Sequence, residues 1–291
     1  MFEGAHTALV TPFRNNRFDE AAFEQLIQFQ IENGISGIVP VGTTGESPTL
    51  SHEEHRRVIE LAVKVAAGRC KVIAGTGSNS TDEAISLTVE AEKAGADAAL
   101  LVLPYYNKPS QEGLFRHFKA IAVATKLPLI LYSIPGRAGI EIGVNTVRRL
   151  AEACPNIVAI KEAGGTVGRV NELRQALPDS FEILSGDDPL TLPFIAAGAV
   201  GVISVASNII PKEVGDLVRA ALAGNLAEAR AIHERWFPLF RDLFLETNPV
   251  PIKTALAMQN RFALEIRLPL CEMSEENTRA LRATLARLRL V

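Results

Sequence analysis

Cysteine is scarce in this chain, and its placement excludes two kinds of cysteine-based structure. There are three cysteines, Cys70, Cys154 and Cys271. The number is odd, the three lie far apart, and no Cys-x-x-Cys pair is present. The chain therefore lacks both the even set of a disulfide framework and the paired thiolates of a structural zinc site. We expect a reducing compartment, the cytoplasm.

An excess of charge is also missing. The chain has 30 Lys and Arg against 33 Asp and Glu, a net charge of −3. Nearly balanced charge gives no basis for binding nucleic acid or an anionic membrane. The N-terminal residues Met1 to Gly4 also lack the charged and then apolar layout of a signal peptide.

One uncharged segment is long enough to consider as a membrane span. No charged residue occurs from Pro189 to Pro211. Proline, glycine, serine and asparagine interrupt this segment, so we expect a short helix over 190–197, a glycine turn and a buried strand over 201–205. We therefore predict no membrane-spanning segment.

Motifs for metals and nucleotide cofactors are absent as well. His52 and His55 lie three residues apart, but the chain contains no His-Glu-x-x-His pattern. The stretch from Gly75 to Ser80 lacks the third glycine of a dinucleotide fingerprint, and no glycine-lysine-serine phosphate loop occurs. We expect neither a metal site nor a nucleotide cofactor.

What the chain does have is a repeated unit of one apolar strand and one helix. The expected strands are 5–10, 37–41, 71–74, 97–103, 128–131, 157–160, 182–184 and 201–205. The expected helices are 19–33, 51–67, 81–94, 110–124, 144–152, 167–176, 190–197 and one from 212. Eight such units predict an α/β fold, a parallel (β/α)8 TIM barrel over residues 1–224. Residues 225–291 show no strand pattern, and we expect a C-terminal helical domain packed on the barrel, with helices at 226–245, 251–259 and 274–290.

Lys161 follows four apolar residues, 157–160, that read as a strand buried on both faces. A desolvated ammonium is unfavourable, and burial favours the neutral amine, which is the form that attacks a carbonyl to give a Schiff base. The alternative is a lysine past the strand end that pairs with Glu162 or another carboxylate. The stretch alone leaves both readings open.

Other polar residues follow the expected strands directly, as catalytic residues do in TIM barrels. They are Thr43 and Thr44, Tyr105 and Tyr106, Tyr132, Arg137, Lys161, and Ser185 with Gly186. If they meet at one mouth, they combine a nucleophile, a carboxylate-binding guanidinium, hydroxyls for proton transfer and backbone amides for an oxyanion. This combination favours carbonyl chemistry on the lysine.

Several of these motifs resemble the class I pyruvate-dependent aldolase and lyase family, which includes the N-acetylneuraminate lyases. The motifs are Gly42-Thr43-Thr44-Gly45-Glu46-Ser47, Pro104-Tyr105-Tyr106-Asn107, Tyr132-x-x-Pro135-x-Arg137-x-Gly139, Ile160-Lys161-Glu162-Ala163, Ser185-Gly186-Asp187-Asp188 and Asn248-Pro249-Val250-Pro251-Ile252-Lys253. They span essentially the whole chain. Within the family they are most similar to the branch that condenses pyruvate with aspartate semialdehyde to open the diaminopimelate route to lysine.

The resemblance implies a role for each matching residue. Lys161 condenses with pyruvate, and no external cofactor is needed. Thr43, Tyr132 and Tyr106 form a proton relay, with Tyr106 supplied by a neighbouring subunit. The amides of Thr43 and Thr44 hold the pyruvate carboxylate. Arg137 binds the carboxylate of the semialdehyde, directly or by ordering the entrance. The backbones of Gly186 and Ile203 line the site.

The resemblance also implies regulation and assembly. Lysine is the expected feedback inhibitor, and the chain is expected to form a homotetramer, a dimer of dimers. The positions that match the lysine site are Ser47, Pro48, His52, His55, Asn79, Glu83 and Tyr105. Family members that are insensitive to lysine often have another residue at His55, and Pro48 often stands as alanine.

Two other functions remain open at this stage. Another pyruvate aldolase, either an N-acetylneuraminate lyase or a 2-keto-3-deoxy sugar acid aldolase, would keep Lys161 and change the second substrate. Sialic-acid lyases usually have Ser-Thr in place of Thr43-Thr44, which argues against that member. A barrel without catalytic activity is the third alternative, and the presence of both Lys161 and Tyr132 argues against it.

Overall fold

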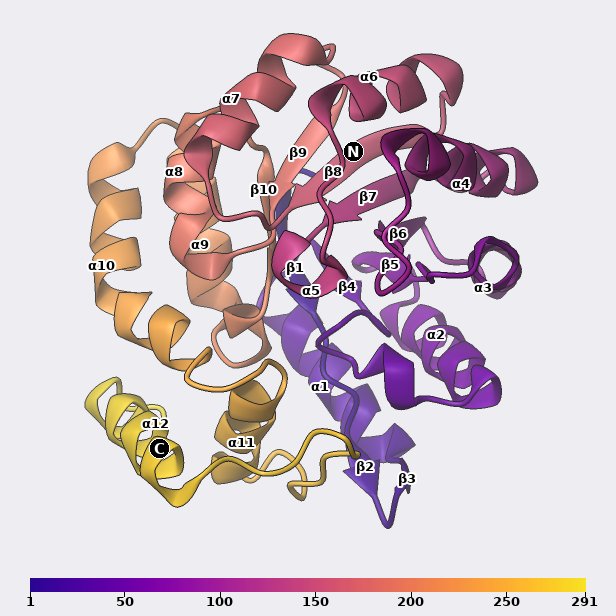
Figure 1. Cartoon of the computed structure of the whole chain (residues 1–291). Helices are drawn as coiled ribbons and strands as arrows, with labels where there is room; N and C mark the ends of the chain where they lie inside the picture. Colours follow the sequence, from indigo (N-terminus) through magenta and orange to yellow (C-terminus); the bar gives the residue numbers. More distant parts are fainter.

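The computed structural model describes residues 1–291 and contains a closed barrel of eight parallel strands (Figure 1). The order around the barrel is β1-β10-β9-β8-β7-β6-β5-β4, and β1 pairs with both β10 and β4 to close it. The strands are β1 (Gly4–Ala8), β4 (Gly37–Val39), β5 (Lys71–Gly75), β6 (Ala98–Val102), β7 (Leu129–Ser133), β8 (Ile157–Glu162), β9 (Glu182–Ser185) and β10 (Gly201–Ser204). The predicted (β/α)8 barrel is confirmed.

Helices surround the barrel, and three more follow it. The first group is α1 (Glu20–Glu32), α2 (His52–Ala66), α3 (Thr81–Ala94), α4 (Gln111–Ala124), α6 (Val144–Ala153), α7 (Val167–Ala176), α8 (Thr191–Ala196) and α9 (Pro211–Leu222). The C-terminal group is α10 (Leu226–Asp242), α11 (Val250–Met258) and α12 (Glu275–Arg287). Most bounds agree with the sequence to within two residues, and the capping box of Ser51 and Glu54 begins α2 as its spacing predicts.

Among the short elements that were not predicted, two lie in loops after barrel strands. A hairpin of β2 (Phe13–Arg14) and β3 (Arg17–Phe18) follows β1, and a single helical turn, α5 (Pro135–Ala138), follows β7. Neither is long enough to give a hydrophobic period. Both occupy loops at the ends of strands, which is the side of the barrel where a TIM-barrel site is built.

The alternation of side chains along each strand divides the core into two clusters. A cluster of 69 buried residues fills the space around the barrel and among the helices, and a cluster of 11 lies inside the barrel. In β7, Leu129 and Leu131 belong to the outer cluster, while Ile130 and Tyr132 belong to the inner one. In β8, Ile160 faces outward. The neighbouring Lys161 therefore faces the barrel interior.

The uncharged segment 189–211 forms α8 and β10, both within the barrel unit. Phe194, Val202 and Ile203 of this segment are almost fully buried. None of the helices combines the length and the apolar character that a membrane crossing requires.

The C-terminal helices pack on the barrel unit, with α10 alongside α9 (Figure 1). The outer core cluster includes Val214 and Leu217 of α9 together with Trp236 and Leu239 of α10 and Leu281 of α12. Because one cluster joins both parts, the division at residue 224 into two domains stays a prediction.

Candidate functional site

Lys161 lies inside β8 and its side chain is buried, with 6% of the residue exposed. In the strand register it stands beside Tyr132 of β7, and its Nζ lies 3.9 Å from the centroid of the Tyr132 ring. Glu162 is not its partner, because the Glu162 carboxylate points to Arg169, with Nε and Oε2 3.5 Å apart. The alternative of a lysine past the strand end, paired with Glu162, is therefore wrong. The amine rests against an aromatic ring.

The loop after β9 closes over the lysine side chain. A Cβ added at Gly186 would lie 3.0 Å from Cε of Lys161 and 2.7 Å from Cβ of Ala163, so only glycine fits without displacement. The Gly186 N–H donates to the carbonyl of Glu162 at 2.8 Å. Gly186 thus brings this loop into contact with the lysine stem.

Two carboxylates follow in the same loop. Asp188 is 2% exposed, and its Oδ2 accepts from the N–H groups of Val205 and Ala206 at 3.0 and 2.9 Å, while its Oδ1 is buried without a partner. Burial raises the pKa of Asp188, and hydrogen bonds and the charge of Lys161 act in the opposite direction. Burial and the neighbouring Asp188 raise the pKa of Asp187 to about 6. Both carboxyl groups therefore belong to the loop that closes over the lysine side chain.

The loop after β4 carries Thr43 and Thr44. Val41 and Glu46 have φ of +51° and +55°, so the chain turns sharply on both sides of the two threonines. Thr43 is half-buried, and Thr44 is buried, with its Oγ1 accepting from Nδ2 of Asn248 at 2.9 Å. The two residues therefore stand in a rigid turn at the carboxyl end of β4, as the sequence predicts.

Arg137 extends from α5 toward the same end of the barrel. Its guanidinium donates to the backbone carbonyl of Asn248 at 2.9 Å. Asn248 thus contacts both Thr44 and Arg137, although sequence reasoning assigned it no role. Its only signal in the sequence is its place in the family motif that begins at Asn248.

One cavity of about 440 Å³ joins several of the predicted site residues. Of the predicted substrate-handling residues it is lined by Thr43, Tyr132 and Arg137. Of the predicted lysine-site residues it is lined by Ser47, Pro48, His52, His55, Glu83 and Tyr105. The two predicted groups therefore border one continuous cavity within a single chain.

The part of the cavity near α2 and α3 has its own polar contacts. Nε2 of His52 lies 3.2 Å from Oε1 of Glu83, and the other Glu83 oxygen accepts from the hydroxyl of Ser78. Nε2 of His55 lies 2.9 Å from the carbonyl oxygen of Gly75, and burial lowers the pKa of His55. His55 is therefore a neutral, fixed ring in the wall, while His52 is exposed beside a carboxylate.

Six predicted residues do not line this cavity, namely Lys161, Thr44, Gly186, Tyr106, Ile203 and Asn79. Lys161 and Thr44 are buried, and Gly186 packs against the lysine stem. Tyr106 is 91% exposed and has a φ of +73°, so its ring projects away from its own barrel. Ile203 is buried inside the barrel in the inner core cluster. The carbonyl of Asn79 accepts from Nδ2 of Asn107 at 2.9 Å. Their predicted roles stay predictions.

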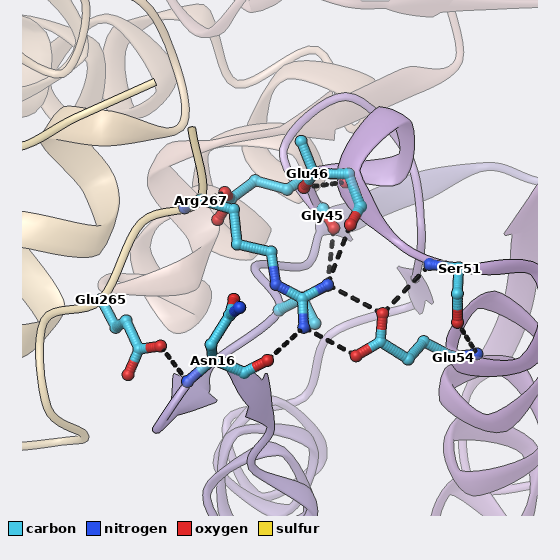
Figure 2. A network of polar contacts seen from close by, with 9 residues as sticks. Asn16, Gly45, Glu46, Ser51, Glu54, Glu265 and Arg267 are labelled. Atoms are coloured by element: carbon cyan, nitrogen blue, oxygen red, sulfur yellow. Dashed lines mark hydrogen bonds and ion pairs between the residues drawn. The ribbon is translucent and has the colours of Figure 1, made fainter. Parts of the chain in front are cut away.

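The loop that carries the threonines is anchored from the C-terminal region through Glu46. Its carboxylate forms a buried ion pair with Lys253 of α11 and accepts from the backbone N–H of Arg267 at 3.2 Å. The Arg267 guanidinium donates to both carboxylate oxygens of Glu54 and to the backbone carbonyl of Asn16 (Figure 2). Segments more than 200 residues apart in the sequence thus fix the loop.

No group of three or more His, Cys, Asp or Glu side chains is placed to hold a metal ion. The chemistry available at the site is that of an amine, hydroxyls, a guanidinium and carboxylates. An amine against a phenol ring, with a carboxylate-binding guanidinium at the entrance, is suited to Schiff-base formation with a small oxo acid.

Comparison with known proteins agrees with this chemistry. A model of the dihydrodipicolinate synthetase family matches residues 1–288. A 4-hydroxy-tetrahydrodipicolinate synthase of Aquifex aeolicus is 54% identical over 285 residues, which cover 98% of this chain and 97% of that protein. The solved synthase of Methylacidiphilum fumariolicum is 58% identical with a TM-score of 0.98, covering 99% of this chain and 96% of that one.

A second similar solved structure contains a bound amino acid. It is described as the dihydrodipicolinate synthase of Cyanidioschyzon merolae with lysine bound. It is 43% identical to this chain with a TM-score of 0.97, and it covers 100% of this chain and 99% of its own.

Proposed function

The chain belongs to the dihydrodipicolinate synthetase family, and from this premise we propose that Lys161 is the amine that binds pyruvate. The reaction is the condensation of pyruvate with L-aspartate 4-semialdehyde to 4-hydroxy-tetrahydrodipicolinate, a lyase activity that begins the diaminopimelate route to lysine. The observation that carries the assignment is the buried Lys161 amine 3.9 Å from the Tyr132 ring at the mouth of the barrel.

The chemistry proceeds through two covalent states of Lys161. The neutral amine attacks the keto carbon of pyruvate, and loss of water leaves a protonated Schiff base. Loss of a methyl proton gives an enamine, whose carbon attacks the aldehyde carbon of the semialdehyde, and the resulting alkoxide takes up a proton. The substrate's own amino group then attacks the Schiff-base carbon, closes the ring and releases Lys161.

Each neighbouring group has a proposed part in these steps. Tyr132 transfers protons, and Thr43 and the partner subunit's Tyr106 extend the relay, which helps because a phenol with a pKa near 10 is a weak base alone. The amides of Thr43 and Thr44 hold the pyruvate carboxylate, and Arg137 holds that of the semialdehyde. Gly186 and Ile203 give the site its backbone walls. No external cofactor takes part.

Reduction with borohydride tests the assignment directly. We expect wild-type protein incubated with pyruvate and borohydride to gain one reduced pyruvate adduct on Lys161, and Lys161→Ala to gain none. Turnover is measured with aspartate semialdehyde and, separately, with N-acetylmannosamine. Turnover with the semialdehyde alone supports the synthase, and turnover with the sugar alone makes the protein a sialic-acid lyase. Absence of an adduct in the wild type would refute the role of Lys161.

Lysine is the proposed feedback inhibitor, and a specific observation favours it. The cavity that holds Tyr132 and Arg137 extends to His52, His55 and Glu83, where a carboxylate and polar groups suit an amino acid. The other proposed contacts are Ser47, Pro48, Asn79 and Tyr105. Initial rates should fall as lysine is added, and a flat curve up to tens of millimolar lysine would contradict the proposal.

The assembly and the compartment follow from the same family membership. We propose a homotetramer made of two dimers, located in the cytoplasm. Sedimentation at several protein concentrations measures the assembly, and a single monomeric species throughout would contradict it.

A further inference from the structure

Asn248 lies between α10 and α11 and is 5% exposed, yet it contacts two separate loops of the mouth. We propose that Asn248 is a positioning residue that holds Thr44 and Arg137 at a fixed position relative to each other. The groups that grip the pyruvate and semialdehyde carboxylates would then stand at the spacing that the reaction needs. This inference rests on the proposed function, because it concerns the same site and the same two substrates.

The first contact fixes the threonine loop. Nδ2 of Asn248 donates to Oγ1 of Thr44 at 2.9 Å, and both residues are at least nine-tenths buried. A buried hydrogen bond of this kind selects one rotamer for each side chain, because the alternative rotamers leave a polar group unpaired. The turn that presents the Thr43 and Thr44 amides is thereby tied to the C-terminal region.

The second contact fixes the guanidinium. Arg137 is largely exposed and stands on the single helical turn α5, so little packing restrains its side chain. Its one protein hydrogen bond joins Nη2 to the backbone carbonyl of Asn248 at 2.9 Å. The direction of this long side chain therefore depends on where the backbone of residue 248 lies.

The position of residue 248 is set in turn by α11. The helix begins two residues later, and the N–H of Lys253 donates to the carbonyl of Pro249 at 3.0 Å. The Lys253 side chain then forms the buried ion pair with Glu46, in the same loop as Thr44. The short helix α11 and the segment just before it thus hold the threonine loop at two points, through Lys253 to Glu46 and through Asn248 to Thr44.

The choice of asparagine is itself informative. Oδ1 of Asn248 is buried and has no partner in the protein. An unpaired buried acceptor is unfavourable, and an apolar residue would avoid it if packing were the only requirement. The amide side chain is explained by the hydrogen bond that its Nδ2 donates to Thr44.

The experiment compares Asn248→Ala, Thr44→Val and the double variant in the full enzyme. Asn248→Ala should raise the KM for pyruvate by about 3- to 10-fold, the range for one lost buried hydrogen bond, while kcat changes less. The KM for aspartate semialdehyde should rise by less, because the backbone carbonyl that accepts from Arg137 is kept and only its position is loosened. In the Thr44→Val background, Asn248→Ala should leave the KM for pyruvate within about 2-fold, because the contact is already gone. Asn248→Asp, which keeps the shape but adds charge near two substrate carboxylates, should raise both KM values even if the alanine variant does not fold.

Asn33→Ala is the matched control. Nδ2 of Asn33 also makes one hydrogen bond, to the carbonyl of Phe29 at 2.8 Å, but at the end of α1 that lies away from the mouth. Asn33→Ala should therefore leave the KM values for pyruvate and for aspartate semialdehyde unchanged.

The outcomes separate this inference from the proposed function. If Asn248→Ala lowers the melting temperature but leaves both KM values unchanged, the residue is structural and the inference is wrong. Independent effects of Asn248→Ala and Thr44→Val on the KM for pyruvate would overturn it as well. The borohydride adduct on wild-type Lys161 reports on the proposed function alone, and it should form with Asn248→Ala too.

Discussion

At the scale of single residues, the lysine stem has almost no free space on the side of Gly186. A methyl group there would stand 3.0 Å from Cε of Lys161 and 2.7 Å from Cβ of Ala163. Gly186 does not have a positive φ, so the glycine is required by this close approach and not by its backbone angles. The position of the amine depends on it.

Gly186→Ala should therefore lower kcat/KM by about 100-fold, because a displacement of about 1 Å at the reacting atoms has an effect of that size. The barrel should stay folded, with a cost of about 1–3 kcal/mol for overpacking. Steady-state kinetics and thermal melting measure the two effects. Gly168→Ala is the control, because a Cβ there meets nothing within 4 Å and its activity should be that of the wild type. Full activity of Gly186→Ala would show that the loop after β9 shifts to make room for the methyl group while Lys161 keeps its position.

His6 makes the stability of the fold depend on pH. The side chain is 1% exposed, Nε2 contacts the carbonyl of Phe2 at 2.8 Å, and Nδ1 has no partner. Burial lowers the pKa of His6 from 6.5 to about 4. The unfolded chain therefore binds a proton at a higher pH than the folded chain does. The stability from a neutral His6 is present above about pH 6.5 and is lost as the pH falls toward 4.

We expect the free energy of unfolding to fall between pH 6.5 and 4, with about 3 kcal/mol from His6 at 1.36 kcal/mol per pKa unit. Urea unfolding at several pH values measures it. His6→Gln should be less stable at neutral pH and should have a shallower pH dependence in this window. Two other groups titrate in this window, because burial lowers the pKa of His117 to about 4 and burial with the neighbouring Asp188 raises the pKa of Asp187 to about 6. Both groups are present in the wild type and in His6→Gln, so their contributions cancel when the two proteins are compared. If the free energy of unfolding falls equally steeply with pH in the wild type and in His6→Gln, His6 is not a source of the pH dependence.

At the scale of elements, the segment between α11 and α12 anchors the loop after β4 through Arg267 (Figure 2). The guanidinium donates to Glu54 at 2.6 and 2.8 Å and to the carbonyls of Thr49 and Asn16 at 2.9 Å each. The side chains of Arg267 and Glu54 are only 11% and 26% exposed. The ion pair is therefore sheltered enough from solvent for its loss to lower the free energy of unfolding.

Arg267→Ala should lower the free energy of unfolding by about 2 kcal/mol, because Glu54 and two backbone carbonyls lose their donor. The matched control is Arg230→Ala, whose partner Glu234 lies 3.2 Å away with both side chains 68% exposed. That change should stay within about 0.5 kcal/mol of the wild type. Denaturant unfolding of the three proteins decides the point, and equal losses for both variants would mean that the Arg267 network adds nothing beyond a surface pair.

The sequence predicted the elements that repeat and did not predict the contacts between distant elements. Strands such as β8 and helices such as α3 and α7 are long enough for apolar periodicity to place them within a residue or two. The polar residues after the strands were predictable because parallel strands end at one side of a barrel. The pairing of Lys253 with Glu46 was not, since it joins positions 207 residues apart and each residue alone resembles a surface charge. Asn248 was overlooked for the same reason.

At the scale of the whole molecule, the site of one chain lacks one predicted member of its relay. Tyr106 is 91% exposed in a loop with a φ of +73°, a strained backbone angle for a residue with a side chain. An exposed aromatic ring held in an unfavourable conformation suggests a contact that a single chain does not supply. The family resemblance places that contact in the active site of a neighbouring subunit.

Hybrid oligomers test whether Tyr106 crosses between subunits. In a twofold dimer each site would take Lys161 from one chain and Tyr106 from the other. Lys161→Ala should be inactive alone, and Tyr106→Phe should retain little activity. Random mixing of equal amounts of the two chains, by joint unfolding and refolding, makes half of the dimers hybrids, and each hybrid has one site with both native groups. About a quarter of all sites should then regain wild-type turnover. If the mixture has only the average activity of the two separate variants, each chain uses its own Tyr106 or none, and the relay across the interface is wrong.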